Sequence, residues 1–263
     1  MSASRPPARP GPPRGTPPGR GRRTAPERVW LYGRHPVLAA LRNPDRRCRR
    51  LAATPNASAW LAEQGYAERT PDEARPEEID RLLPDGAVHQ GLAGEFTDLP
   101  RRRLDEVCDP NAPGAVLVLD QVTDPQNIGA LLRVAAAMGV QAVVAQDRRT
   151  PPLAGATAKA AAGTAEIVPL VRVVNIARAM EGLRERGFRL AGLAGEGAVP
   201  LGAYVPDGPV ALIAGAEGKG LRALVRETCD DLVSIEMATG VESLNVSTAT
   251  AIALYTLRDK ASA

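Results

Sequence analysis

Three polar segments in the second half of the chain contain residue types that bind ligands or stabilise developing charge. The first spans residues 120–129, DQVTDPQNIG, and Arg133 follows four positions later. The second spans residues 215–220, GAEGKG, and the third spans residues 236–247, EMATGVESLNVS. Amide, hydroxyl and carboxylate groups supply hydrogen-bond donors and acceptors, and glycine lets a backbone approach a ligand closely. These segments are therefore candidate binding loops.

Each segment also has an ordinary structural interpretation. Asn127 is a suitable N-cap for a helix, and Arg133 can lie at the edge of that helix. Glu217 precedes a helix, where acidic residues are favoured in any case. The glycine-rich turn matches neither the P-loop nor the dinucleotide-binding pattern, and residues 243–247 can be a polar helix cap. Taken singly, the segments indicate an α/β domain with an unknown ligand.

Apolar runs precede all three segments and predict the strands that position them. Strands are expected at residues 115–119, 142–145, 167–170, 189–193, 210–214 and 231–235, and helices at 128–138, 154–163, 175–186, 221–227 and 247–257. Strands that alternate with helices predict a parallel sheet, and uninterrupted apolar strands are typical of a sheet covered on both faces. Because ligands bind at the carboxyl ends of such strands, the three segments should lie at one edge.

The first part of the chain changes composition in steps. The opening stretch is rich in proline, glycine and arginine and predicts disorder, either as an arm that contacts phosphates or as an extension without a role. A short helix is expected after His35-Pro36 and another at residues 77–83, and the arginines around Arg46 are interpreted as a solvated face. The expected division is a tail at 1–27, a small α/β domain at 28–97, a linker at 98–114 and a second domain at 115–263.

Composition excludes several classes of protein. The chain has 263 residues and no apolar run near the roughly 20 residues of a membrane span, and it begins without a signal peptide's apolar core. Cys48, Cys108 and Cys229 are far apart, which argues against a disulfide framework or a zinc site. Six arginines against Glu27 in residues 1–27 leave a formal charge of −2 for the rest of a chain whose total is +3. We expect a cytoplasmic protein without a metal, whose folded part is nearly neutral.

Together, the segments closely resemble the three motifs of the SpoU (TrmH-type) methyltransferases. The matching residues are DPQNIG at 124–129 with Arg133, GAEGKGL at 215–221 and SLNVS at 243–247. The resemblance extends to ATAK at 156–159 with Glu166, to GRHPV at 33–37 and to HQG at 89–91. The last two resemble the substrate-binding domain of family members that methylate a guanosine of 23S rRNA. The resemblance covers residues 28 to about 260.

The resemblance implies a fold and partners that the residue patterns alone do not. It implies the SPOUT fold, a parallel α/β sheet with a deep C-terminal trefoil knot, which the rarity of threaded chains would otherwise argue against. It also implies a homodimer with active sites near the interface, and an N-terminal domain similar to the ribosomal proteins L30 and L7Ae. The implied reaction is methyl transfer from S-adenosylmethionine to an RNA ribose 2′-hydroxyl, without a metal.

The resemblance assigns cofactor contacts to the second and third segments. Backbone groups around Gly215, Ile235 and Leu244 would hold S-adenosylmethionine, while Ser243 and Asn245 shape the loop.

The catalytic roles fall on the first and second segments. A guanidinium stays protonated at ordinary pH, so Arg133 is expected to grip the substrate phosphate and stabilise the developing alkoxide rather than accept a proton. Asn127 would help to place Arg133, and Glu217 would orient either Arg133 or the ribose.

Departures from the family pattern keep two alternatives open. Glu236 stands where proline is usual, Gly240 lies one place late, and Val134 replaces a common serine or threonine. The alternatives are a tRNA ribose 2′-O-methyltransferase and an RNA-binding relative without catalysis. For His35 and His89, RNA contact or a structural role is favoured over catalysis.

Overall fold

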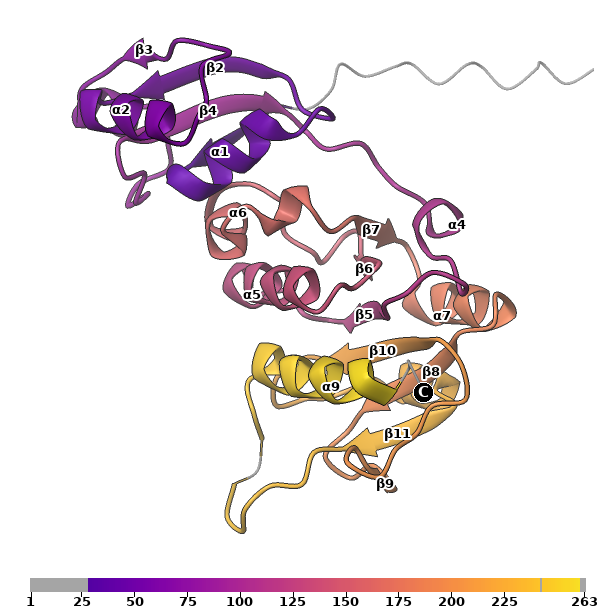
Figure 1. The fold of residues 1–263 in the computed structure, drawn as a ribbon. Helices are drawn as coiled ribbons and strands as arrows, with labels where there is room; N and C mark the ends of the chain where they lie inside the picture. The colour runs from indigo at the N-terminus through magenta and orange to yellow at the C-terminus, as the bar shows by residue number, and fades with distance from the viewer. Residues whose placement is uncertain (1–27, 242, 261–263) are drawn as a thin grey trace, which may run out of the picture.

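The computed structural model describes residues 28–241 and 243–260. The segment for which disorder is predicted, residues 1–27, lies outside the described residues. Two β-sheets follow one another along the chain, each covered by helices (Figure 1). Within the described ranges, no helix is long and apolar enough to cross a membrane.

The N-terminal unit is built on a four-stranded sheet with the order β1-β4-β2-β3. Its elements are β1 (Arg28–Tyr32), α1 (Arg34–Arg42), β2 (Cys48–Ala53), α2 (Pro55–Glu63), β3 (Asp72–Glu73), α3 (Pro76–Asp80) and β4 (Leu92–Thr97). Side chains alternate between the faces of a strand, so Leu31 packs with α1 and α2 while its neighbour Tyr32 packs with Ile79 of α3. Both faces of the sheet are therefore covered.

Helix α2 was not predicted from the sequence, although its start follows a familiar rule. The Thr54 side chain accepts a hydrogen bond from the Ala57 amide at 3.4 Å, and Pro55 occupies the first turn. The helix buries Ala57 and Leu61 against the sheet. Its apolar stripe is narrow, and this explains why hydrophobic periodicity did not reveal it.

The C-terminal unit is built on a seven-stranded sheet with the order β7-β6-β5-β10-β8-β11-β9. Its elements are β5 (Val116–Asp120), α5 (Pro125–Ala137), β6 (Ala142–Gln146), α6 (Gly155–Ala161), the 3-10 helix η1 (Thr164–Glu166), β7 (Leu170–Val173), α7 (Ile176–Glu185), β8 (Arg189–Leu193), β9 (Val199–Pro200), β10 (Val210–Gly215), α8 (Ala223–Thr228), β11 (Asp231–Ser234) and α9 (Val246–Lys260). Neighbouring strands pair in parallel throughout. The parallel α/β fold predicted from the alternation of elements is confirmed.

Alternate residues of the central strands face two separate apolar cores. Leu117 and Leu119 lie in a core with α5 and α9, and Val116 and Val118 lie in a core with α7 and α8. The strands are buried on both faces, which accounts for the uninterrupted run VLVLD. The sheet is thereby a rigid platform whose carboxyl edge carries the loops.

Two local predictions were wrong. The strand expected at 167–170 starts only at Leu170, because η1 and the turn before Pro169 occupy the preceding residues. Asn127 is not the N-cap of α5: Asp124 is, since its carboxylate accepts from the amides of Gln126 and Asn127. The Asn127 side chain is consequently available for other partners.

The segment expected to be a linker, residues 98–114, packs against the C-terminal unit. It contains α4 (Leu104–Val107), and Cys108 is buried in the core beside α7. The Gln141 side-chain amide donates to the carbonyls of Asp109, Ala112 and Gly114 at 2.8 to 3.0 Å. The hydrophilic composition of this segment concealed these contacts.

Candidate active site

A cavity of about 410 Å³ lies at the carboxyl edge of the second sheet. Residues 193–196 after β8, residues 214–221 around the end of β10, and Ile235 after β11 contribute to its wall. Ser243 and Leu244, just before α9, complete it. The cavity therefore brings together the second and third polar segments singled out from the sequence, and its size is that of a small-molecule site.

The loop after β10 is a tight turn that only glycine permits at two positions. A Cβ on Gly215 would lie 2.2 Å from the carbonyl carbon of Gly220, and the Gly220 amide donates to the Ala216 carbonyl at 2.8 Å. Gly218 has a φ of 74°, a conformation that side chains disfavour. The turn holds its backbone against the cavity.

Asp120, at the end of β5, holds the end of this loop through Arg222. Its fully buried carboxylate accepts from the Arg222 backbone amide at 2.9 Å and from Arg222 Nε at 2.8 Å. The carboxylate is satisfied by both a backbone donor and a guanidinium, so it restrains the end of the loop as well as the side chain. Asp120 was not predicted as a site residue, because its only signal in the sequence is a lone carboxylate at the end of an apolar strand.

Asn245 joins the three segments through its side chain. Its Nδ2 donates to Asn127 Oδ1 at 3.0 Å and to Glu217 Oε2 at 3.3 Å. Its Oδ1 accepts from the Ser247 amide at 2.9 Å and from the Ser247 hydroxyl at 2.6 Å. We call Asn127, Glu217 and Asn245 the amide junction. It lies on the surface next to the cavity, where a ligand can replace one of its partners.

Arg133 is not part of this junction in the single chain. It lies six residues after Asn127 on α5, about 9 Å along the axis and about a third of a turn around it. Its side chain is exposed, and it does not line the cavity. Within residues 28–241 and 243–260, no hydrogen bond or ion pair restrains its guanidinium. The structure thus brings together every predicted site residue except Arg133.

One departure from the family pattern, Glu236, lies between two residues that line the cavity. Ile235 and Met237 line it, while Glu236 between them is exposed to solvent, and Gly240 adopts a φ of 88° in a turn. Val134 packs against the core beneath α5. None of the three removes a group from the amide junction.

Other groups that could support different chemistry are satisfied structurally. His89 Nδ1 accepts from the Gly91 amide at 3.0 Å, and its Nε2 lies 3.2 Å from an Asp80 carboxylate oxygen. Burial raises the pKa of the Cys229 thiol to about 12, so it is not a thiolate at neutral pH. In the described part of the chain, no three His, Cys, Asp or Glu residues cluster as metal ligands.

Comparison with known proteins identifies both units. Residues 114–255 match the model of the SpoU rRNA Methylase family, and residues 30–102 match that of the RNA 2′-O ribose methyltransferase substrate-binding domain. A 23S rRNA (guanosine-2′-O-)-methyltransferase RlmB from Pseudomonas syringae is 40% identical over 242 residues, covering 86% of this chain and 93% of the relative. The RlmB of Ralstonia nicotianae is 47% identical over 169 residues, covering 64% of this chain and 68% of the relative.

Solved structures share the fold across both units. The SpoU methyltransferase AviRb from Streptomyces viridochromogenes, in complex with AdoMet, superposes with a TM-score of 0.74 at 24% identity, covering 87% of this chain and 88% of that one. A TrmH-family protein from Porphyromonas gingivalis gives a TM-score of 0.69 at 26% identity, covering 88% of this chain and 90% of that one. The resemblance inferred from the motifs is confirmed, and the chain belongs to the SpoU rRNA methylase family.

Proposed function

We propose that this protein transfers a methyl group from S-adenosylmethionine to the ribose 2′-hydroxyl of a guanosine in 23S rRNA. Two motif loops line one cavity, and the first motif loop is joined to them through the amide junction; this observation carries the proposal. The relative named as a 23S rRNA guanosine methyltransferase aligns with both units of the chain. An RNA-binding relative without catalysis would have no need to keep the junction intact.

The cavity suits S-adenosylmethionine in size and in the chemistry of its wall. Backbone groups around Gly215, Ile235 and Leu244 would hold it, and the mixture of apolar and polar wall residues matches a ligand with a nucleoside and an amino-acid end. Ser243 lines the same wall, and Asn245 fixes the loop through Ser247. The bound sulfonium supplies a methyl group that is already electrophilic.

The chain's own residues must then align the acceptor ribose and stabilise its developing negative charge. Asn127 and Glu217 lie beside the cavity, where the junction would position the ribose hydroxyls. Arg133 would hold the adjacent phosphate through a bidentate contact and stabilise the alkoxide as the hydroxyl proton passes to water. In-line alignment contributes a large part of the rate, because it replaces a chance encounter between two molecules.

We propose a homodimer, because Arg133 is exposed outside the cavity of its own chain. Tyr255 and Ile252 are exposed on α9, the helix that packs beside α5. A second copy docked on this face would bury both side chains and place Arg133 close to a cavity at the interface. The assembly is thus expected to have two sites that each depend on both copies.

The finer points of architecture are part of the same proposal. We place the substrate-binding domain at 28–97, with an L30- or L7Ae-like fold, the connecting segment at 98–114 and the methyltransferase domain at 115–263. The trefoil knot would involve the segments after β10. In the sheet, β10 lies between β5 and β8. We place the enzyme in the cytoplasm, where it would meet ribosomal RNA.

Methyl-labelled S-adenosylmethionine and protein-free 23S rRNA test the activity directly. We expect label on a guanosine ribose, located by nuclease digestion and mass spectrometry. Transfer RNA is the matched control substrate, because it would be the substrate of the alternative function. A solved structure that concerns the methylation of tRNA covers 57% of this chain. Label on a base, preferential labelling of tRNA, or no transfer at all would contradict the proposal.

A further inference from the structure

Two motifs that the cavity does not use meet where the two units touch. GRHPV at 33–37 begins α1, and ATAK at 156–159 lies in α6. Helix α1 contacts both α6 and η1. A Cβ on Gly163 would lie 2.8 Å from Ala39 Cβ, and Lys159 Nζ donates to the Val88 carbonyl at 2.8 Å. We call this contact region, formed by α1, the loop before β4, α6 and η1, the seam. It joins the substrate-binding unit to the methyltransferase unit.

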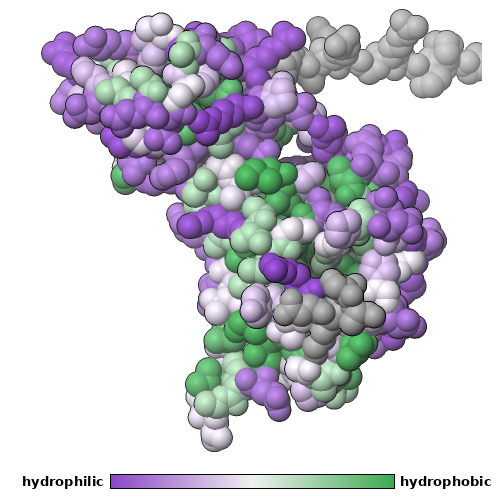
Figure 2. All heavy atoms as spheres, viewed as in Figure 1, coloured by the Kyte–Doolittle hydropathy of each residue, from purple (hydrophilic) through white to green (hydrophobic). Residues whose placement is uncertain are grey.

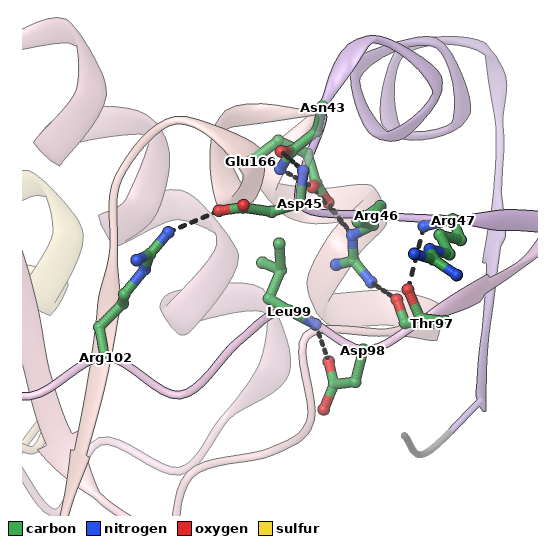
Figure 3. A network of polar contacts seen from close by, with 9 residues as sticks. All are labelled: Asn43, Asp45, Arg46, Arg47, Thr97, Asp98, Leu99, Arg102 and Glu166. Carbon is green, nitrogen blue, oxygen red and sulfur yellow. Dashed lines mark hydrogen bonds and ion pairs between the residues drawn. The ribbon is translucent and has the colours of Figure 1, made fainter. Parts of the chain in front are cut away.

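A buried ion pair lies at the end of the seam (Figure 3). Arg46 Nε is 2.9 Å from both carboxylate oxygens of Glu166, and Asn43 Nδ2 donates to Glu166 Oε2 at 2.7 Å. Arg46 Nη1 donates to the Thr97 carbonyl at 2.9 Å. The Arg46 side chain is 0% exposed and that of Glu166 is 6% exposed. We call Asn43, Arg46 and Glu166 the latch.

The prediction that Arg46 belongs to a solvated face was wrong. Its neighbours Arg47, Arg49 and Arg50 are exposed, but Arg46 turns inward between the units. Among the described residues, Glu166 is the carboxylate that pairs with Arg46. The Nη2 atom of Arg46 is buried without a hydrogen-bond partner. A buried arginine depends heavily on its single counter-charge, because water is not there to replace it.

Ala158 of α6 is buried in the core of the N-terminal unit, but the apolar contact between the units is incomplete beside the latch. A cavity of about 350 Å³ lies beside the latch, between residues 98–102 of the connecting segment and residues 165–172. Figure 2 shows the N-terminal unit projecting beyond the rest of the molecule. An incompletely packed contact between domains permits relative motion unless directional bonds oppose it. The latch supplies such bonds, because Arg46 Nε and Asn43 Nδ2 of the N-terminal unit both donate to the Glu166 carboxylate.

We propose that Glu166 is a positioning residue for methyl transfer, which holds the substrate-binding unit at one angle to the cavity. It touches neither reactant. By fixing Arg46 and Asn43, it keeps RNA bound to the N-terminal unit in register with the amide junction. This role rests on the proposed function, since it concerns how the acceptor RNA reaches the site.

The test compares Glu166→Gln with wild type in the full-length protein. Glutamine keeps the shape but removes the charge, so trypsin cleavage at the exposed Arg101, Arg102 and Arg103 should become about tenfold faster as the units separate. The KM for a 23S rRNA fragment should rise by about tenfold, with kcat within about twofold. The affinity for S-adenosylmethionine, measured by calorimetry, should not change.

Two further variants separate orientation from stability. Asn43→Ala removes a neutral partner of the same carboxylate without leaving a buried charge, and it should shift KM and proteolysis in the same direction by a smaller amount. Asp72→Asn is the matched control, because it breaks the exposed Arg50–Asp72 pair of 3.9 Å within the N-terminal unit, away from both the latch and the cleavage sites. It should behave like wild type in every assay.

The outcomes distinguish the latch from the activity. Unchanged proteolysis and RNA KM in Glu166→Gln would overturn the latch, and so would a parallel loss of kcat, cofactor affinity and thermal stability, which would indicate a general folding role. Absence of methyl transfer by wild type would refute the proposed function instead. In that case the proteolysis comparison among the three variants would still decide whether the latch holds the units together.

Discussion

The amide junction and the latch are built from similar groups but lie in opposite environments. Each contains an asparagine and a glutamate, and each joins segments that are more than a hundred residues apart in sequence. The junction is exposed and held by uncharged amide donors, whereas the latch is buried and centred on an arginine. Exposed amide bonds exchange readily with a ligand, while a buried ion pair is costly to open. The junction is therefore suited to binding, and the latch to holding an arrangement.

The largest expected difference concerns the two arginines. Arg46→Ala leaves Glu166 buried without its counter-charge and should lower the free energy of unfolding by about 3 to 5 kcal/mol. Urea denaturation followed by circular dichroism measures this. Arg47→Ala, at the exposed neighbour, is the control and should change stability by less than about 0.5 kcal/mol. Similar losses in the two variants would show that the latch does not differ from an ordinary surface.

Arg133→Ala should give the opposite result. Because its side chain is exposed and unrestrained within the described chain, stability and cofactor affinity should remain unchanged. The kcat for RNA methylation should fall about 100-fold or more, as expected when a donor to a developing oxyanion is removed. Arg133→Lys should recover only part of the rate, since lysine cannot make a bidentate contact. Full activity in Arg133→Ala would remove this residue from the site.

Two glycines extend the comparison to the backbone. A Cβ on Gly215 meets the Gly220 backbone at 2.2 Å, so Gly215→Ala should distort the cavity and weaken S-adenosylmethionine binding by about tenfold to a hundredfold. Gly163→Ala strains the seam instead, because this glycine has a φ of 94°, and should leave cofactor binding intact. Calorimetry on both proteins measures the difference. Gly182→Ala, in α7 and away from the cavity, serves as the neutral variant, because its Cβ would meet nothing within 4 Å.

The smallest effects are expected from the two asparagines. Asn245→Ala removes the hydrogen bonds to Asn127 and Glu217 and the two accepted from Ser247, and should weaken cofactor affinity by about fivefold to tenfold. Asn43→Ala should leave that affinity unchanged and raise the KM for RNA. Equilibrium binding and steady-state kinetics on the same two preparations provide the comparison. If both variants lost cofactor affinity equally, the two clusters would not be functionally separate.

The sequence predicted the parallel sheet well because its strands are buried on both faces. Runs such as VALIA leave few alternatives once helices alternate with them. The N-terminal strands were missed because charged residues interrupt them: β2 reads CRRLAA, with arginines at its exposed end. Hydrophobic periodicity is weak in a short strand that is only partly covered.

The candidate site was predicted in its composition but not in its connections. Asn127, Glu217 and Asn245 were each singled out as separate residues, and the sequence contains nothing that indicates their shared hydrogen bonds. Asp120 was passed over because a lone carboxylate at the end of a strand has many ordinary roles. Arg46 looked like its three exposed neighbours, and only the tertiary fold separates it from them. Contacts between distant segments carry no local pattern.

The Asp120–Arg222 contact has a consequence for the order in which the protein matures. The two residues are separated by 102 positions, so β5 leaves the ribosome long before its carboxylate can be neutralised. Until then Asp120 must remain hydrated, which opposes early closure of the sheet around it. The N-terminal unit, whose strands end at Thr97, can fold during that interval. During synthesis, an RNA-binding surface would therefore exist before the chain is able to bind its methyl donor.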